Sequence, residues 1–119
     1  MSGGIHESGQ PLALPSSGSS CLFSSNLEWQ SSDGSGFWYK FLYKNEKAGQ
    51  RTLLMKLDPG AYSPGHSHSE LEQIYVVEGS FYDEEHTYTS GDYIIRAPGA
   101  EHTTGSKDGA IALLVYSTI

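Results

Sequence analysis

The sequence predicts an all-β fold, a jelly-roll barrel preceded by an extended N-terminal arm. Most apolar residues fall into short runs that end near glycine or proline, which are typical turn residues. These runs are rich in aromatic and β-branched residues, which favour strands. No window has the periodicity of an amphipathic helix, and about eight short strands with turn signals suit a jelly roll.

The size and charge of the chain limit its organisation and its partners. With 119 residues and a mass of 12.9 kDa, it has room for one domain with one core. Seven Lys and Arg residues against 14 Asp and Glu residues give a net charge of -7. Such a chain repels phosphate backbones and anionic lipid surfaces, so we expect neither nucleic acid nor a membrane as a partner.

Cysteine content and the N-terminal residues bear on the cellular compartment. Cys21 is the single cysteine, so the chain has no internal disulfide and no CxxC pair for zinc or redox chemistry. The first residues, MSGGIHESGQ, lack the basic and apolar regions of a signal peptide. We therefore expect a cytoplasmic protein.

The first part of the chain forms the predicted arm. Nine of the twenty residues 16–35 are serine, with only scattered apolar residues among them. Segments rich in serine and glycine form extended or flexible structure rather than helices. We therefore assign residues 1–36 to an N-terminal arm and residues 37–119 to the barrel.

The predicted barrel strands begin at Phe37. The run FWYKFLYK is dominated by aromatic residues and ends at the turn-like NEKAG. The next run, RTLLMKL, stops at Asp58-Pro59-Gly60, where proline fixes one backbone dihedral and glycine permits a positive one. The pattern continues to the C-terminus in PGHSHSELEQIYVVEG, SFYDEEHTYTSGD, YIIRAPG, EHTTGS and AIALLVYS.

The segment PGHSHSELEQIYVVEG also carries the first candidate site. His66 and His68 are two positions apart, so on a strand their side chains point to the same face. Glu72 lies an even number of positions further on and returns to that face, with Ile74 and Val76 beside it as an apolar floor. Two histidines at this spacing also occur at hydrated strand ends, so a metal site requires a further ligand elsewhere in the chain.

His102 is the expected further ligand. It lies in GDYIIRAPGAEHTTG, where Gly91 opens a strand and Pro98-Gly99 turns the chain before the next one. Three imidazoles and one carboxylate leave a divalent ion with a net positive charge and, if the ion is octahedral, two open positions. This ligand set accepts iron, manganese, nickel, cobalt, copper or zinc. The candidate ligands of one divalent metal ion per chain are therefore His66, His68, Glu72 and His102.

The spacing of these residues resembles the first motif of the cupin family. That motif has a glycine, five residues, HxH, three residues, a glutamate, six residues and a second glycine. Every spacing is met here, by Gly60, His66, His68, Glu72 and Gly79.

The second cupin motif is matched in part. Gly91, Gly99 and His102 sit at the family spacing, but Ala97 stands where the family has a proline, with Pro98 one place later. Phrases such as YVVEGSFYDEE and TSGDYIIRAPGAEH are similar to a subgroup that includes the cupin half of the anti-sigma factor ChrR and small β-diketone-cleaving dioxygenases. The resemblance covers residues 27–116 and implies the cupin double-stranded β-helix.

The resemblance and the open metal positions together lead to an expected function. We expect a metal-dependent enzyme, an Fe(II)-type dioxygenase acting on a small carbonyl-containing or enolisable compound. The family permits Glu72 to act either as a ligand or as a base that has left the metal.

Three alternatives remain open at this point. The same residues suit a metal-dependent lyase or isomerase in which the metal acts as a Lewis acid. They also suit a non-catalytic sensory or small-molecule-binding cupin like that of ChrR. A third alternative is a metal that only stabilises the fold.

Four further residues are candidates for the substrate pocket. Tyr62, Tyr75 and Tyr93 flank the segments that carry the ligands, and a tyrosine hydroxyl there can hydrogen-bond a substrate. Arg96 either faces the barrel mouth as an anion clamp or, like most charged side chains, is exposed to solvent.

The expected oligomeric state is a homodimer. The strand FWYKFLYK would leave a large apolar face exposed in a single chain. Small cupins commonly pair in this way, and the N-terminal arm has the length to reach a partner subunit.

Overall fold

The computed structural model describes residues 5–7, 10–31 and 33–119, and its all-β architecture confirms the predicted fold class. Within these residues there is no α-helix, only one 3-10 turn, Ser24–Asn26. The strands are β1 (Ile5–Glu7), β2 (Ser19–Cys21), β3 (Gln30–Ser31), β4 (Phe37–Asn45), β5 (Gln50–Leu57), β6 (Tyr62–His66), β7 (Leu71–Tyr82), β8 (Thr87–Thr89), β9 (Tyr93–Arg96), β10 (His102–Gly105) and β11 (Ala110–Ser117).

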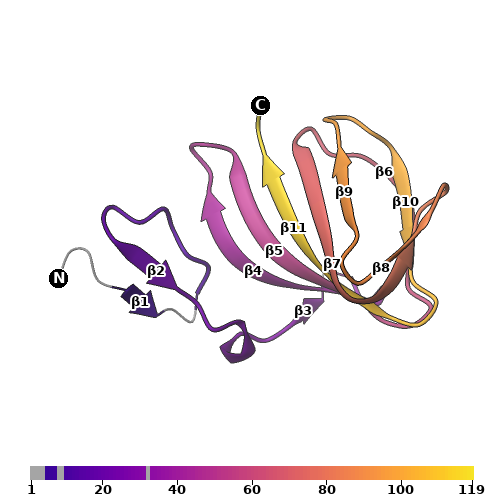
Figure 1. Ribbon diagram of the computed structural model, residues 1–119, viewed down its shortest axis with the longest axis horizontal. Coiled ribbons are helices and arrows are strands. Elements are labelled where there is room, and N and C mark those ends of the chain that lie inside the picture. Colours follow the sequence, from indigo (N-terminus) through magenta and orange to yellow (C-terminus); the bar gives the residue numbers. More distant parts are fainter. Residues whose placement is uncertain (1–4, 8–9, 32) are drawn as a thin grey trace.

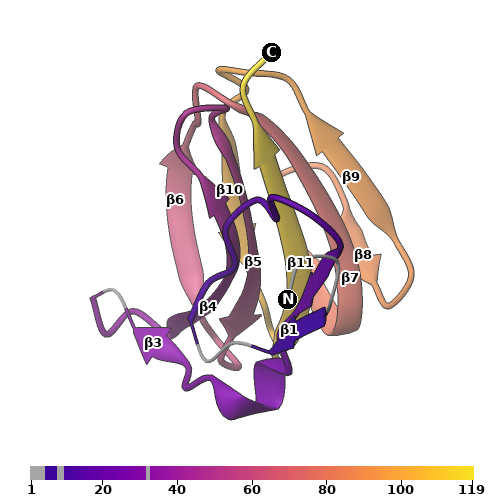
Figure 2. The ribbon, with the colours of Figure 1, turned by 90° about the vertical axis from the view of Figure 1, so that its left-hand side faces the viewer.

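One curled sheet makes up most of the molecule (Figure 1). Its strand order is β3-β4-β5-β11-β7-β10-β6, with β8 and β9 also paired to β7, and every pair in it is antiparallel. Figure 2, turned by 90°, shows that the strands wrap around an interior rather than lying flat. The sheet is a half-barrel, because its terminal strands β3 and β6 are not paired with each other in the described residues.

Two glycines shape the ends of the strands. Gly60 follows Asp58-Pro59 and has φ +86°, as the turn sequence predicts. Gly79 interrupts the long strand β7 with φ +73°, and its missing side chain lets the backbone of Gly109 and Ala110 approach closely. Beyond Gly79, β7 changes partners from β9 to β8, so this glycine marks the bend of the curled sheet.

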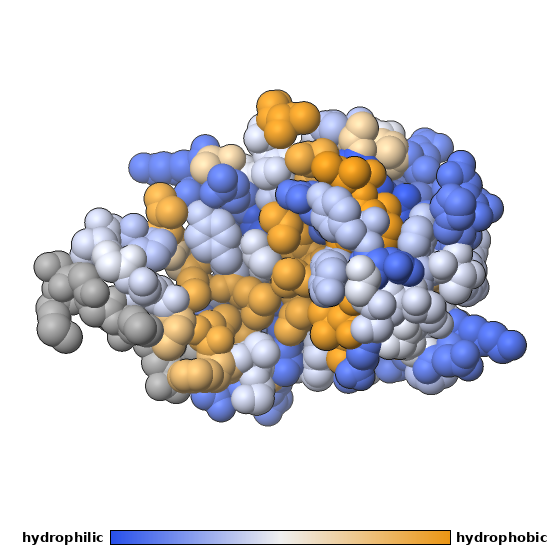
Figure 3. All heavy atoms as spheres, viewed as in Figure 1, coloured by the Kyte–Doolittle hydropathy of each residue, from blue (hydrophilic) through white to orange (hydrophobic). Residues whose placement is uncertain are grey.

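The core lies inside the curl and follows the alternation of the strands. In β11, every second residue from Ala110 to Tyr116 is buried, which is the pattern of a strand with one face inward. Ile74 and Val76 of β7 are buried as their parity with Glu72 predicts. Outward-facing Tyr75 of β7 is exposed on the opposite face. In Figure 3, apolar residues gather in a band across the middle of the molecule, while its right-hand end is mostly hydrophilic.

Part of the predicted arm belongs to the sheet. β3 pairs with β4, and Leu12 bridges to Tyr43, so residues before Phe37 add to the β4 edge. The parallel pair β1–β2 forms a separate small sheet beside the half-barrel (Figure 1). Residues 1–4, 8–9 and 32 of the arm lie outside the described residues. Among the described residues, no helix has the length and apolar character needed to cross a membrane.

Candidate metal centre

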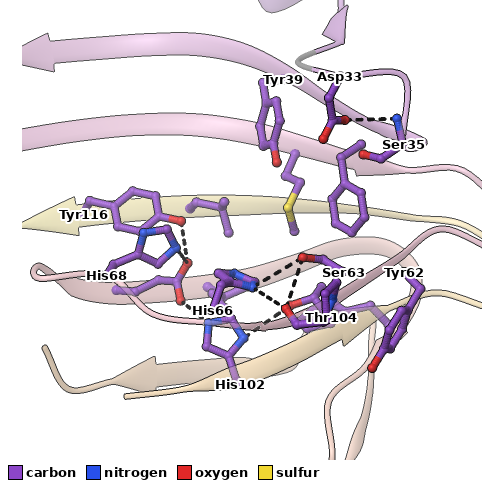
Figure 4. A pocket seen from close by; sticks show the side chains of 17 residues that line it. Asp33, Ser35, Tyr39, Tyr62, Ser63, His66, His68, His102, Thr104 and Tyr116 are labelled. Carbon is purple, nitrogen blue, oxygen red and sulfur yellow. Dashed lines mark hydrogen bonds and ion pairs between the residues drawn. The ribbon is translucent and has the colours of Figure 1, made fainter. Parts of the chain in front are cut away.

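Three histidines predicted from the sequence lie together on the inner face of the half-barrel (Figure 4). His66 ends β6, His68 lies two residues later, and His102 begins β10. The antiparallel register pairs His66 with His102, so residues far apart in sequence become cross-strand neighbours. One ligand nitrogen from each ring lies within 4.8 Å of the other two. This cluster could hold a metal ion.

The hydrogen-bond surroundings of two rings favour coordination through Nε2. Nδ1 of His66 lies 3.3 Å from the carbonyl oxygen of Pro64. Nδ1 of His102 lies 3.3 Å from both the Thr103 carbonyl oxygen and the Thr104 hydroxyl. A ring that donates a proton from Nδ1 presents its lone pair at Nε2, which is how a metal-binding histidine is usually oriented.

Glu72 lies beside the histidines, although the mutually close group contains only the three rings. Its carboxylate is almost completely buried, with Oε1 3.5 Å from Nε2 of His102 and Oε2 3.9 Å from Nε2 of His68. The hydroxyl of Tyr116 donates a hydrogen bond of 2.5 Å to Oε2. The carboxylate is therefore held in place from the side of β11 while it faces the rings.

Arg96 is neither the anion clamp nor the solvent-exposed side chain that the sequence suggested. β9 pairs with β7 so that Arg96 stands opposite Glu72, and its side chain is only 12% exposed. Its Nη2 donates to Asp83 at 3.1 Å, and its Nε lies 3.6 Å from Oε1 of Glu72. The arginine is buried because two carboxylates, one from each side, balance its charge.

Three buried polar atoms at this point have no hydrogen-bond partner among the described residues. They are Oε1 of Glu72, Nε of Arg96 and Nε2 of His102. Buried polar atoms are rarely left unpaired, and such groups often mark the place of an ion. A divalent cation between the imidazole and the carboxylate would satisfy Nε2 of His102 and Oε1 of Glu72 together. The residues present therefore fit a metal ion.

The protonation states also suit a cation. Burial lowers the pKa of His68, against the opposing effect of Glu72, so its ring is neutral at neutral pH, as coordination requires. Burial alone would raise the pKa of Glu72, but the adjacent His102 ring and the hydrogen bond from Tyr116 bring it below its usual value. Burial, and then the charge of Glu72, strongly raise the pKa of Tyr116, which stays a hydrogen-bond donor.

The histidines open into a cavity of about 320 Å³ inside the half-barrel (Figure 4). Its apolar walls are Phe37, Met55, Pro64, Ile74, Phe81 and Leu114. The remaining lining residues are polar or aromatic and come from both the arm and the barrel: Asp33, Ser35, Tyr39, Tyr62, Ser63, His66, His68, Glu72, His102, Thr104 and Tyr116.

Of the three tyrosines predicted for the substrate pocket, one lines the cavity and two do not. Tyr62 belongs to the cavity lining, although about half of it is exposed and its ring points away from the histidines in Figure 4. Tyr75 and Tyr93 are cross-strand partners on the outer face of β7 and β9, and neither lines this cavity. The hydroxyl of Tyr93 instead donates to Gln73 at 2.6 Å.

Sequence reasoning missed the residue that holds Glu72. Tyr116 lies near the end of AIALLVYS, and the alternation of that strand places it on the same face as Leu114. That alternation was a signal for an inward-facing tyrosine. The contribution of Asp33 and Ser35 had no such signal, because these arm residues reach the cavity only through the pairing of β3 with β4.

Comparison with known proteins places the chain in a family. The model of the ChrR cupin-like domain matches residues 18–118. A search of curated protein sequences finds no match to this chain.

Solved structures share the fold. An RmlC-like cupin from Shewanella frigidimarina NCIMB 400 is 25% identical, with a TM-score of 0.72 over 82% of this chain and 88% of that one. The structure of Rhodobacter sphaeroides SigE in complex with the anti-sigma ChrR matches at 24% identity and a TM-score of 0.68, over 81% of this chain but only 51% of that one. A candidate acetylacetone dioxygenase from Methylibium petroleiphilum PM1 is 14% identical, with a TM-score of 0.71 over 78% of this chain and 72% of that one.

These matches agree with the architecture of the chain. The curled antiparallel sheet is the cupin fold, and the three histidines lie on its inner face. The chain is thus a cupin and belongs to the family of ChrR cupin-like domains.

Proposed function

We propose that this cupin is a metal-dependent enzyme of the dioxygenase type, which uses Fe(II) to act on a small carbonyl-containing or enolisable compound. One observation carries the proposal: the three histidines converge at the wall of a cavity of about 320 Å³ inside the half-barrel. A metal that only stabilised the fold would need no such space in front of it, whereas a reacting molecule does.

The chain's own residues would divide the work as follows. His66, His68 and His102 hold the ion as neutral nitrogen donors, and Glu72 is either a fourth ligand or a base for the acidic proton of the substrate. A bound divalent ion would lower the pKa of that proton and, as Fe(II), supply electrons to dioxygen. The hydrogen bond from Tyr116 keeps the Glu72 carboxylate turned toward the reacting centre.

The cavity sets the class of substrate. A volume of about 320 Å³ accommodates a small molecule and not a polymer segment. Phe37, Met55 and Phe81 give it an apolar wall, while oxygen atoms of the substrate would face the histidines. A compound with two neighbouring oxygens and a short apolar body fits a cavity with histidines on one side and apolar side chains on the other.

The test is oxygen consumption by the metal-loaded protein. Chain purified without chelator is analysed for metals, reconstituted anaerobically with Fe(II), and assayed for oxygen uptake with β-dicarbonyls, phenols and thiols. We expect substrate-dependent uptake that is lost in His102→Ala and kept in His86→Ala, because His86 lies exposed beyond the end of β7. Absence of uptake with every compound, in protein shown to contain one Fe(II) per chain, would contradict a dioxygenase.

The family match favours a second candidate, a metal-binding sensory or small-molecule-binding module without turnover. In that case the chain retains zinc after purification, takes up no oxygen, and changes its metal spectrum or stability when a small molecule binds. A lyase or isomerase would instead convert a substrate under nitrogen. These measurements distinguish the dioxygenase, the non-catalytic module and the lyase or isomerase.

We further propose that the chain forms a homodimer. The outer face of β7 and β9 exposes Tyr75, Val77, Tyr93 and Ile95, and a single chain leaves these side chains uncovered. Light scattering of the full chain is expected to give twice the monomer mass; a monodisperse monomer would contradict this proposal.

A further inference from the structure

A buried ion-pair network lies behind the histidines. The carboxylate of Asp83 accepts four hydrogen bonds. Two come from the backbone N–H groups of Glu85 and His86, which donate to Oδ1 at 2.8 and 2.9 Å. The other two come from the side chains of Tyr88 and Arg96, which donate to Oδ2 at 2.6 and 3.1 Å. The side chain of Asp83 is only 4% exposed, so it forms a rigid anchor for the guanidinium of Arg96.

Arg96 joins this anchor to the candidate metal centre. One end of its guanidinium is bonded to Asp83, while Nε faces Oε1 of Glu72 at 3.6 Å, too long for a hydrogen bond. Both Nε and Oε1 are buried and unpaired within the described part of the chain. Oε1 is also the oxygen closest to His102, so the arginine and a metal ion would approach the same atom.

We propose that Arg96 is the resident counter-charge of Glu72 and competes with the metal for its carboxylate, so that the Asp83–Arg96 pair sets how tightly the site holds its ion. Without metal, Arg96 balances the buried charge of Glu72. With metal, the carboxylate is shared between two cations that repel each other. This inference rests on the proposed metal site, but it does not depend on which reaction the site performs.

The competition predicts effects of opposite sign for the two partners of the pair. Removing the charge of Arg96 leaves Glu72 without its counter-charge and removes the repulsion of the ion, so metal binds more tightly. Removing the charge of Asp83 frees Arg96 to interact with Glu72 alone, so metal binds less tightly. Since the pair is sheltered from water, its effective dielectric is about 20 and each change is expected to alter the affinity at least about tenfold.

The experiment measures the affinity of the full chain for Zn²⁺ alone. Metal is removed with a chelator, and the dissociation constant is then obtained by competition with a chromophoric chelator. Arg96→Met is expected to lower the dissociation constant about tenfold or more, and Arg96→Lys, which keeps the charge, to stay close to the unaltered chain. Lys107→Met is the control: it removes one positive charge from an exposed residue in the turn between β10 and β11, so the affinity should change less than threefold or so.

Asp83→Asn separates this role from a merely structural one. Asparagine keeps an oxygen for the two backbone N–H groups but loses the charge that holds Arg96. A general loosening of the fold would weaken zinc binding in both Arg96→Met and Asp83→Asn, whereas competition gives opposite signs. Zinc affinity that is unchanged or weaker in folded Arg96→Met would overturn the inference.

A different result would refute the proposed metal site itself. If the unaltered chain and His102→Ala bind zinc equally weakly, the site itself is refuted. Tight binding by the unaltered chain with no oxygen uptake refutes the dioxygenase and leaves the role of Arg96 to be decided by the variants. Circular dichroism of each metal-free variant establishes that it is folded before its affinity is compared.

Discussion

Replacing Tyr116 with phenylalanine tests how the fold stabilises the buried carboxylate. The change removes one hydroxyl and leaves the ring, which packs in the core with only 4% exposure. The hydroxyl donates to Oε2 of Glu72 at 2.5 Å, and the next polar atom near Oε2 is Nε2 of His68 at 3.9 Å. Phenylalanine therefore leaves an ionised oxygen without a hydrogen-bond partner among the described residues.

The expected loss follows from the charge and burial of the acceptor. A hydrogen bond to a charged group contributes about 1.5–3 kcal/mol, and an orphaned buried acceptor places the loss in the upper part of that range. We therefore expect metal-free Tyr116→Phe to lose about 2–3 kcal/mol at pH 7. For a chain of this size, roughly 4 °C of melting temperature corresponds to each kcal/mol, which gives a decrease of about 8–12 °C.

The same change has a defined pH dependence. The pKa of Glu72 is below its usual value in the folded protein, so its stabilisation is present above the unfolded pKa of about 4.3. It is lost as the pH falls through the lowered folded pKa. Tyr116 contributes to that lowering of the pKa. The difference in the free energy of unfolding between the unaltered chain and Tyr116→Phe should therefore be largest near neutral pH and shrink in acid.

Urea unfolding of the chelator-treated proteins at several pH values measures both effects. Tyr43→Phe is the control, because it removes an exposed, neutral hydrogen bond of 2.9 Å to Gln50 and should change stability by at most about 0.5 kcal/mol. A loss in Tyr116→Phe no larger than in the control, or a difference that grows in acid, would refute the account of Glu72 given above.

Other predictions concern the bend of the sheet and the anchor behind the site. Gly79→Ala should destabilise the chain by about 2–4 kcal/mol in urea unfolding, because its new Cβ meets backbone atoms of Gly109 and Ala110 at a positive φ. Gly60→Ala, with open space and φ +86°, should cost about 1 kcal/mol; equal losses would contradict the close approach. Burial and the hydrogen bond to Asp83 raise the pKa of Tyr88 from 10.0 to about 12, so its stabilisation is present below pH 10 and lost as the pH rises to about 12. Tyr88→Phe should flatten the fall of stability in that window, and an unchanged profile would exclude this group as its cause.

The histidines could be found from the sequence because their spacing is local. His66 and His68 share a strand face by parity, and the motif around them fixed the place of Glu72. His102 required only one further step, the expectation of another ligand after a turn. Alternation likewise predicted the burial of Ile74 and Val76, which follow Glu72 on the inner face of β7.

The surroundings of the site were harder to predict because they depend on register between distant strands. Arg96 is buried because β9 aligns it with Glu72, and because Asp83 comes within reach from the end of β7. Tyr75 and Tyr93 lie near the ligands in sequence, but β7 and β9 turn both to the outer face. Nearness along the chain therefore predicted the ligands better than it predicted the cavity walls.

The position of β6 at the end of the sheet has a kinetic consequence. β6 is hydrogen-bonded only to β10 in the described part of the chain, and it carries His66 at its last residue. Edge strands open more readily than central ones, since fewer hydrogen bonds must break. Each opening would withdraw His66 while Glu72 stays in place on the central strand β7. If the histidines hold an ion as proposed, its residence time would therefore follow the fraying of this edge rather than the stability of the whole domain.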